Sequence, residues 1–311
     1  MIYDTIIIGA GPAGLTAAIY TLRAGLSTLI MEDPSVMSQA GYAAIIENFP
    51  GFPEGINGIG LVSNFKKQVN SLGGTIVSVR VKVVSICDEQ GKGLWQVSSD
   101  KGEYKTVSVI VASGATAKRL GVKGELEFSG KGVSYCAVCD GIFFKDKNIA
   151  IVGGGDSALE EALFLIRFAK KVTIIHRRDR LRAVKLLQDR VFSDKKIEVA
   201  WNSVVDEIWG KDKVEKIRIK DTRSGFLAEI ECEGVFVSIG KMPNTGFLKN
   251  VLDIDENGYI ITDKSLKTSA CGVFACGDCR DTLFRQIVTA CGDGALSAES
   301  CIRYIDSMKG V

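Results

Sequence analysis

Cys136 and Cys139 are the side chains in this chain with the clearest capacity for chemistry, because Cys-x-x-Cys spacing lets two sulfurs form one small disulfide ring. This spacing also lowers the pKa of a thiol, so that a thiolate nucleophile is present near neutral pH. The disulfide can then be opened and closed repeatedly by thiol exchange. The pair therefore predicts a redox-active dithiol.

Zinc binding is an alternative explanation for the pair, because Cys276-Gly277-Asp278-Cys279 supplies a second Cys-x-x-Cys. Four thiolates held on zinc would leave the glycine-rich turns described next without a purpose, so we expect no metal. We expect Cys276 and Cys279 to fill positions at a strand end and a helix start. A second redox pair at these two residues is the less favoured alternative.

Two glycine-rich turns predict nucleotide-binding elements. Residues 6–8 form a short apolar strand, 9–14 a Gly-Ala-Gly-Pro-Ala-Gly turn, and 15–25 a helix that ends at a glycine, before a strand that ends at Glu32. The same plan recurs with a strand at 149–152, a Gly153-Gly154-Gly155 turn capped by Asp156, and a strand at 172–175. One such turn is weak evidence, but two in matching units are strong evidence for dinucleotide binding.

Each unit continues into a segment of alternating polar and apolar residues, 75–111 and 197–237, which we interpret as β-meanders that return to the main sheet. The sequence therefore predicts an α/β fold with two Rossmann-like dinucleotide-binding domains of the three-layer ββα type. The second copy is inserted in the first, and the C-terminal residues rejoin the first.

The residues after the second strand of each unit face the adenosine ribose in such folds. Glu32 suits a ribose 2′-hydroxyl and repels a phosphate, which favours FAD or NAD at the first turn. At the second turn His176, Arg177, Arg178 and Arg182 favour the 2′-phosphate of NADPH. A solvated, basic helix start is the alternative for this segment.

The chain contains one histidine, which weakens hydrolase and histidine-metal mechanisms. We assign His176 to the adenosine end of the nucleotide and not to acid–base catalysis. Asp140, directly after Cys139, then remains as the acid that protonates the departing thiolate.

Composition excludes several partners. A net charge of +2 from 39 basic and 37 acidic residues gives no signal for nucleic acid, and no segment has the apolar length of a membrane span. The N-terminus is typical of a first strand and not of a signal peptide. Nine scattered cysteines, an odd number, suit a reducing cytoplasm.

Together these motifs resemble the low-molecular-weight thioredoxin reductases along nearly the whole chain. The matching segments are the Gly9–Gly14 turn, Glu47–Gly51, Gly132–Asp140, Gly153–Ala158, His176–Arg182, Gly240–Asn244, Gly272–Asp278 and Arg285-Gln286. Two positions depart from the family pattern: Met37-Ser38 replaces the usual glycine pair before Gln39, and Ile142 begins the apolar Ile142–Phe144 segment that the family uses for docking.

The resemblance implies two cofactors and a division into an FAD domain at 1–115 and 247–311 and an NADPH domain at 116–246. It implies that FAD is bound by Gly9, Gly11, Pro12, Ala13, Gly14, Glu32, Gln39, Asn48, Gly277, Asp278, Arg285 and Gln286. It places NADPH on Gly153, Gly155, Asp156, Ser157, Ala158, His176, Arg177, Arg178 and Arg182.

The implied activity is thioredoxin-disulfide reduction in a cytoplasmic homodimer. Electrons pass from NADPH through FAD to the Cys136–Cys139 disulfide, with Cys139 on the flavin side and Cys136 attacking thioredoxin or a thioredoxin-like protein. A flavin-dependent dithiol oxidase, or a reductase of another small disulfide protein, is the alternative function. An oxidase that passes electrons to oxygen would have little use for arginines at a 2′-phosphate.

Overall fold

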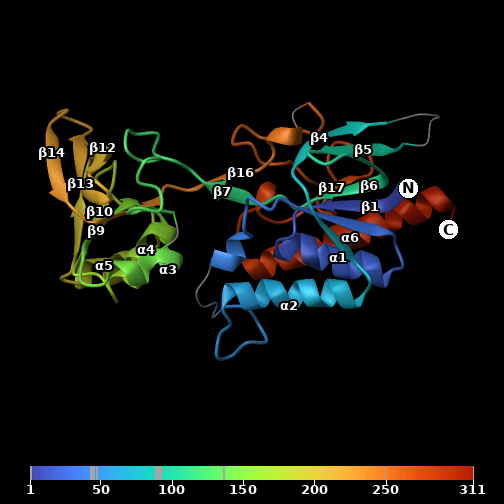
Figure 1. The fold of residues 1–311 in the computed structure, drawn as a ribbon, viewed down its shortest axis with the longest axis horizontal. Helices are drawn as coiled ribbons and strands as arrows, with labels where there is room; N and C mark the ends of the chain where they lie inside the picture. The colour runs from blue at the N-terminus through green and yellow to red at the C-terminus, as the bar shows by residue number, and fades with distance from the viewer. Residues whose placement is uncertain are drawn as a thin grey trace. The chain divides into compact units, whose positions relative to one another are not determined.

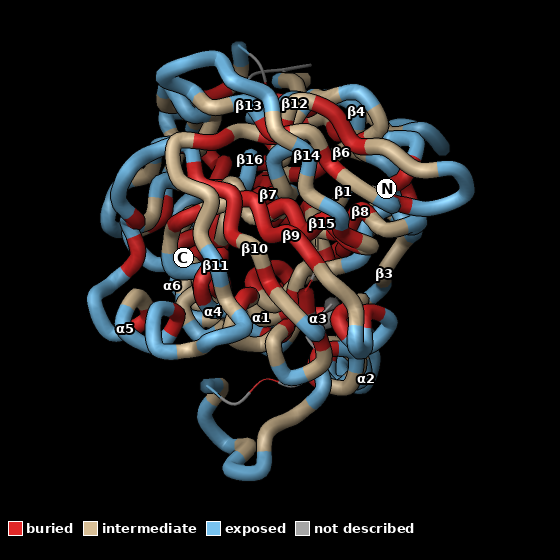
Figure 2. The backbone as a smooth tube through the Cα atoms, turned by 90° about the vertical axis from the view of Figure 1, so that its left-hand side faces the viewer, coloured by how far each residue is buried: buried red, intermediate tan, exposed pale blue. Residues whose placement is uncertain are grey.

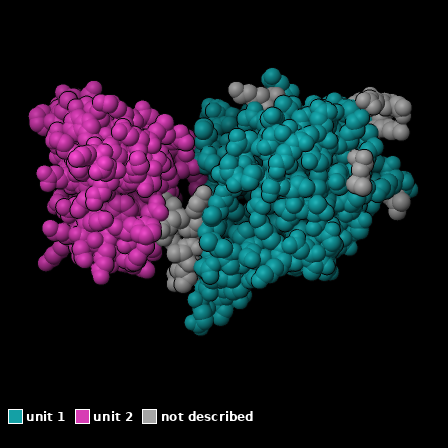
Figure 3. Space-filling model, in the orientation of Figure 1, with its two compact units in different colours: residues 1–116, 242–311 teal, residues 117–241 magenta. Residues whose placement is uncertain are grey.

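The structure is a computed structural model of the chain. It describes residues 2–42, 46, 48–87, 93–135, 137–248 and 250–310, except for the side chains of Tyr42, Val138 and Cys139. The chain divides into two compact units (Figure 3): residues 1–116 with 242–311, and residues 117–241. The second unit is thus a continuous insertion between the two parts of the first.

The first unit is built on a sheet whose central strands are parallel (Figure 1). Its order is β3-β2-β1-β6-β5-β4, and β17 also pairs with β6. The strands are β1 (Ile2–Ile8), β2 (Thr28–Glu32), β3 (Thr75–Ser78), β4 (Val81–Ile86), β5 (Trp95–Ser99), β6 (Glu103–Val111) and β17 (Val273–Ala275).

The β-meander of this unit consists of β4, β5 and β6, which are antiparallel neighbours. Residues 103–106 of β6 pair with β5, and residues 105–111 pair in parallel with β1. Strand β6 therefore carries the meander into the main sheet, as the sequence predicted.

Helices cover one face of this sheet. They are α1 (Pro12–Arg23), α2 (Gly58–Ser71) and α6 (Ile287–Lys309). The unit also has three short 3-10 turns, η1 (Gln39–Tyr42), η3 (Gly246–Leu248) and η4 (Gly277–Cys279). Pro12 is suited to the first position of α1, because the backbone N–H groups in the first turn of a helix make no intrahelical hydrogen bond and proline lacks this group. Gly25, at φ +77°, ends the helical segment in a conformation that glycine adopts without strain.

The sheet of the first unit separates two hydrophobic cores. Ile7 points toward α1 and α6, where it packs with residues such as Leu15 and Phe274. Its neighbours Ile6 and Ile8 point to the opposite face and pack with the meander. This alternation follows from the two-residue period of a strand, and it produces helix, sheet and meander layers.

The second unit repeats the plan with the order β11-β10-β9-β15-β8. Its parallel strands are β8 (Val133–Ser134), β9 (Asn148–Gly153), β10 (Lys171–Ile175), β11 (Ile197–Ala200) and β15 (Gly234–Ser238). Its helical segments are α3 (Ala137–Asp140), η2 (Gly141–Phe144), α4 (Asp156–Leu165) and α5 (Lys185–Ser193). The meander is a separate sheet of β12 (Ser203–Gly210), β13 (Val214–Asp221) and β14 (Leu227–Glu231).

The second unit also has a core on each face of its sheet. Ile149 and Ile151 pack with α4 and α5, whereas Ala150 and Val152 pack with the meander. Figure 2 shows the parallel strands β9 and β10 as buried segments within the exposed loops of the unit. The three-layer ββα architecture predicted for both domains is therefore confirmed.

The two segments that join the units form a small sheet of their own, β7 (Ala115–Ala117) and β16 (Lys241–Pro243). The units divide at 116/117 and 241/242, whereas the sequence placed the boundaries at 115/116 and 246/247. The second difference has a local cause. The Asn244 side chain donates to Ser113 O and Thr245 Oγ1 donates to Gly258 O, so this stretch is fastened to the first unit.

A buried carboxylate fixes the loop before the dithiol. Glu125 is 1% exposed and accepts hydrogen bonds from the backbone N–H groups of Leu120 and Gly121 at 2.8 and 2.7 Å. It also accepts from the hydroxyl of Tyr135 at 2.8 Å. Tyr135 immediately precedes Cys136, so Glu125 ties this loop to the start of the dithiol segment.

We expect Glu125→Leu to lower the free energy of unfolding by about 2 to 4 kcal/mol, because it leaves three donors without their acceptor. Glu127→Leu, at an exposed position two residues on, is the matched control and should change it by less than about 0.5 kcal/mol. Denaturant unfolding measures both values. Equal stability of the two variants would contradict this role of Glu125.

Candidate functional site

Two glycines of the first turn, Gly9 and Gly14, lie too close to neighbouring backbone atoms to carry a side chain. A Cβ added at Gly9, which has φ +114°, would lie 2.2 Å from Ala112 O, and one at Gly14 would lie 1.9 Å from Gly9 O. At Gly11 the nearest atom, Ser38 Oγ, is 3.5 Å away. Gly11 opens outward at the N-terminus of α1, where backbone N–H groups and the helix dipole favour a phosphate. The turn fits the pyrophosphate of a dinucleotide.

Glu32 ends β2 beside this turn, which confirms its predicted position at a strand end. Its two carboxylate oxygens accept hydrogen bonds from Lys66 Nζ of α2 at 2.6 and 2.8 Å. Sequence reasoning missed Lys66, because a contact between residues so far apart leaves no local pattern. The ammonium group offsets the charge of Glu32 and holds its carboxylate at the end of the strand.

Two predicted FAD ligands from distant segments lie together. Asn48 Nδ2 donates to Gln286 Oε1 at 3.0 Å, and Gln286 precedes the first residue of α6. Gln39, at the start of η1, donates from its side-chain amide to Ala115 O. Gly277, another predicted ligand, lies beside the start of α1, since a Cβ on it would be 2.9 Å from the Ala13 Cβ.

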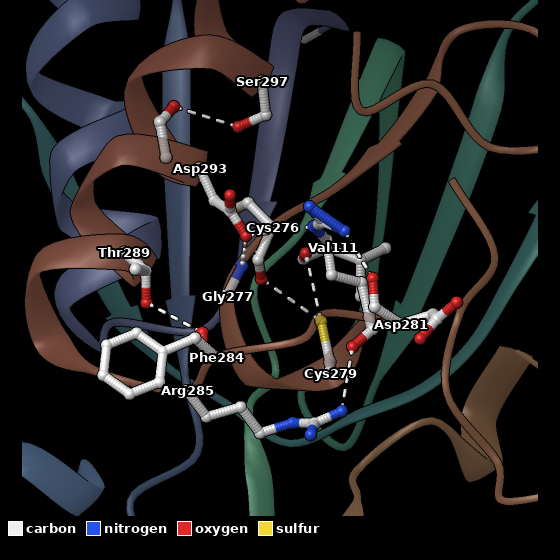
Figure 4. A network of polar contacts seen from close by, with 12 residues as sticks. Val111, Cys276, Gly277, Cys279, Asp281, Phe284, Arg285, Thr289, Asp293 and Ser297 are labelled. Atoms are coloured by element: carbon white, nitrogen blue, oxygen red, sulfur yellow. Dashed lines mark hydrogen bonds and ion pairs between the residues drawn. The ribbon is translucent and has the colours of Figure 1, made fainter. Parts of the chain in front are cut away.

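The turn that carries Asp278 is fastened by α6 (Figure 4). Asp293 Oδ2 accepts from Gly277 N–H at 3.1 Å and from Arg280 Nε at 3.0 Å. The Asp293 and Arg280 side chains are only 19% and 17% exposed, so this ion pair is largely shielded from water. Sequence reasoning missed both residues, although they organise the turn that presents Asp278.

Arg285 contributes an unused donor to the same region. Its guanidinium lies 4.1 Å from the centre of the Tyr259 ring, and its Nη2 donates to Arg280 O at 3.4 Å. Its buried Nε has no hydrogen-bond partner among the described residues. Because a buried polar group without a partner is costly, Arg285 fits a position that a bound group completes.

The second glycine turn repeats the close approach of its first glycine to a neighbouring strand end. A Cβ at Gly153 would lie 2.3 Å from Ser238 O and 2.6 Å from the Ala158 Cβ, whereas Gly155 has no neighbouring atom within 4 Å. The turn leads into α4, whose N-cap position is Gly155. The prediction that Asp156 caps this helix was wrong, because its Oδ1 accepts from the N–H of Val184 at 2.7 Å instead.

The basic segment after β10 is a loop. Helix α5 begins only at Lys185, so the alternative of a basic helix start does not describe Arg177, Arg178 and Arg182. All three arginines are exposed, and Arg182 N–H donates to Gly154 O at 2.7 Å. The loop therefore carries three exposed guanidinium groups, and its backbone is joined to the second turn at Arg182. His176, in contrast, is only 5% exposed.

The predicted dithiol lies only partly within the described chain. Cys136 lies outside the described residues, and Cys139 belongs to α3, which ends at Asp140. Of the apolar residues that follow, Ile142 and Phe143 are exposed, at 56% and 69%. The expectation that Phe144 belongs to a docking surface was wrong, because it packs against the Phe236 ring in the core.

Cys276 and Cys279 pack in different cores. Cys276 belongs to the helix-facing core of the first unit and Cys279 to the opposite one. The Cys279 thiol donates to Cys276 O at 3.3 Å and to Val111 O at 3.5 Å (Figure 4). Burial raises the pKa of both thiols, which disfavours the reactive thiolate.

These geometries find a counterpart in known proteins. Residues 3–294 match the model of the pyridine nucleotide-disulphide oxidoreductases. The chain belongs to this family. The thioredoxin reductase of Bacillus subtilis is 45% identical to it over 309 residues, covering 99% of this chain and 96% of that protein. The thioredoxin reductase of Treponema pallidum is 42% identical over 307 residues, covering 99% and 98%.

Solved structures agree with these relatives. The crystal structure of Lactococcus lactis thioredoxin reductase in its FR conformation superposes with a TM-score of 0.89 at 41% identity, covering 98% of this chain and 99% of that one. The thioredoxin reductase of T. acidophilum gives a TM-score of 0.84 at 35% identity, covering 98% and 99%. The resemblance predicted from the motifs is therefore confirmed.

Glu161 of α4 is a further residue that sequence reasoning missed. Burial raises its pKa to about 7, and the neighbouring Glu160 adds to this effect, whereas Ser238 and Lys241 oppose it. A carboxyl group whose pKa is higher in the folded than in the unfolded state favours folding at low pH. This stabilisation is lost as the pH rises from the pKa of Glu161 in the unfolded chain toward its pKa of about 7 in the folded protein.

We expect Glu161→Gln to raise the free energy of unfolding by about 1 to 3 kcal/mol near pH 8, because the amide carries no charge to bury. Near pH 4.5 the difference should vanish, because the carboxyl group of the folded protein is then already neutral. Denaturant unfolding at the two pH values measures this. A constant difference across the range would contradict it.

The cysteine assignments predict a labelling pattern. Iodoacetamide should modify the exposed Cys271 of the native protein and leave the buried Cys276 and Cys279 unmodified at about pH 8. Mass spectrometry of peptides identifies the modified sites. A Cys276–Cys279 disulfide in the oxidised protein would overturn their assignment as core residues.

Proposed function

We propose that this protein is an NADPH-dependent thioredoxin-disulfide reductase with FAD as its bound cofactor. The observation that carries this function is the joint presence of two matching nucleotide turns, one in each unit, and a Cys-x-x-Cys segment in the second unit. Similarity to thioredoxin reductases over 99% of the chain supports it.

FAD is assigned to the first unit. The open position at Gly11 suits its pyrophosphate, and the carboxylate of Glu32 suits its adenosine ribose. Arg285 Nε, which has no partner within the described part of the chain, suits its flavin end. Asn48, Gln286 and the turn of Asp278 complete the binding residues. When bound, FAD supplies a carrier that takes electrons from the nicotinamide and passes them to the dithiol.

NADPH is assigned to the second unit. The open position at Gly155 and the N-terminus of α4 suit the pyrophosphate. The exposed guanidinium groups of Arg177, Arg178 and Arg182 suit the 2′-phosphate, which each can bind through charge-assisted hydrogen bonds. The same arginines argue against the alternative function as an oxidase.

The dithiol carries the electrons to the protein substrate. Cys136 attacks the disulfide of thioredoxin or a thioredoxin-like protein, Cys139 closes the ring again on the flavin side, and Asp140 protonates the departing thiolate. Ile142 and Phe143, both exposed directly after this segment, offer an apolar contact for that partner.

The assembly follows from the same proposal. The FAD domain comprises 1–116 and 242–311 and the NADPH domain 117–241, with the compact units as their extents. We propose a homodimer in the cytoplasm, where free thiols remain reduced. Among the described residues, no helix has the length and apolar character to cross a membrane.

We expect Cys136→Ser and Cys139→Ser each to abolish thioredoxin reduction while leaving FAD bound and reducible by NADPH, because only the last relay is cut. Cys271→Ser, which changes an exposed thiol, is the matched control and should keep full turnover. Stopped-flow absorbance and a thioredoxin assay separate the two steps. Thioredoxin turnover in either relay variant would exclude the pair as the carrier.

We expect the double variant Arg177→Ala/Arg178→Ala to raise the KM for NADPH at least about tenfold and to leave the KM for NADH nearly unchanged, because the lost bonds involve only the 2′-phosphate. Arg223→Ala, which removes an exposed guanidinium paired with Asp179, is the control. Equal losses with both nucleotides would mean that the two arginines serve the fold.

A further inference from the structure

We propose that His176 is a positioning residue that joins the second glycine turn to the arginine loop, with hydrogen on both of its ring nitrogens. This inference deepens the proposed function, because it rests on NADPH binding at the second turn. It assigns the selectivity for the 2′-phosphate partly to a buried ring that itself contacts no phosphate.

Both ring nitrogens of His176 face carbonyl oxygens. Nδ1 lies 3.0 Å from Gly153 O, and Nε2 lies 2.9 Å from Arg180 O. A carbonyl oxygen can only accept a hydrogen bond. A neutral imidazole carries hydrogen on one nitrogen, so it would set a lone pair against one of these oxygens. Only the form with two N–H groups satisfies both contacts.

The ring is enclosed from several sides. A Cβ at Gly154 would lie 2.2 Å from Nδ1, so the absence of a side chain there admits the ring beneath the turn. The Trp201 ring meets it edge to face, with the centroids 6.2 Å apart. The backbone of His176 is fixed as well, since its N–H donates to Ala200 O and its carbonyl accepts from Ser203. The ring therefore has little freedom to leave either oxygen.

The two oxygens belong to the two parts of the nucleotide site. Gly153 begins the turn assigned to the pyrophosphate, and Arg180 lies in the middle of the loop that carries Arg177, Arg178 and Arg182. A second link, from Arg182 N–H to Gly154 O, joins the same two segments. The imidazole thus sets the distance between the pyrophosphate turn and the guanidinium groups, and its positive charge lies beneath the turn.

The charges around the ring are mostly basic. The loop contributes Arg177, Arg178, Arg180 and Arg182, and Asp179 is engaged by Arg223 at 2.8 Å. The arginine heads are exposed, so water screens their repulsion from the buried ring. The two carbonyl oxygens are the groups that compensate the imidazolium directly.

Two substitutions separate the two hydrogen bonds. In His176→Asn the amide nitrogen occupies the place of Nδ1 and can still donate to Gly153 O, but the contact with Arg180 is lost. In His176→Gln the amide nitrogen occupies the place of Nε2 and can still donate to Arg180 O. Each variant is therefore the matched control of the other.

We expect His176→Asn to lower the preference for NADPH over NADH, measured as the ratio of the two kcat/KM values, about three- to tenfold, the worth of one hydrogen bond. His176→Gln, which keeps the loop in place, should retain the preference for NADPH over NADH. A KM that rises equally for both nucleotides in His176→Asn, or an equal loss of preference in the two variants, would overturn the proposal.

The wild-type protein supplies an independent test, because His176 is the sole histidine and its ring signals need no assignment. In ¹⁵N-labelled protein without nucleotide, long-range ¹H–¹⁵N spectra near neutral pH should show both ring nitrogens bearing hydrogen. A ring nitrogen without hydrogen would overturn the proposal whatever the variants do. If the wild type fails to oxidise NADPH, the proposed function fails instead, and the spectrum still decides the state of the ring.

Discussion

The close approach of each glycine turn to the end of its neighbouring strand is the constraint on which both nucleotide sites depend. Gly9 lies over Ala112 at the end of β6, and Gly153 lies over Ser238 at the end of β15, with no room for a Cβ in either place. This contact fixes the position of the first residues of α1 and of α4 relative to the sheet of each unit. The open glycine of each turn then leaves room for a phosphate at a helix N-terminus.

The two units share this geometry and differ in the charges at the adenosine end. In the first unit Glu32 ends its strand and is held by Lys66. In the second unit the equivalent position is occupied by His176, which is buried. The arginines that follow it in the sequence are exposed. One backbone plan therefore carries opposite local charges in the two units, and this difference is the basis for proposing a ribose hydroxyl at the first and a 2′-phosphate at the second.

Local patterns predicted the elements and the turns. The apolar strand at 149–152, the glycine spacing and the alternating segments each depend on neighbours in sequence, and the structure has them as β9, the turn before α4, and the meanders. The same local patterns assigned Asp156 to a helix cap. They could not show that its carboxylate accepts a hydrogen bond from Val184, which lies far along the sequence. It also grouped Phe144 with exposed Ile142, since a run of apolar residues does not reveal which of them faces the core.

Long-range contacts could not be predicted in this way. Lys66 reaches Glu32, and Asp293 reaches the turn before Asp278, through tertiary packing that no spacing encodes. His176 was predicted at the nucleotide site. Its contacts with Gly153 O and Arg180 O could not be predicted, because they depend on how the loop folds against the turn. Most of the candidate ligands could thus be predicted from the sequence, whereas the residues that hold them in position could not.

The central claim is that one electron path joins the nicotinamide nucleotide, the flavin and the Cys136–Cys139 pair. Anaerobic titration of the purified protein with dithionite, followed by flavin absorbance and thiol counting, tests it most directly. The account predicts that each chain takes up about four electrons, two for the flavin and two for the disulfide, and that the double variant Cys136→Ser/Cys139→Ser takes up about two. Uptake of about two electrons by the wild type, with no new thiols, would contradict it.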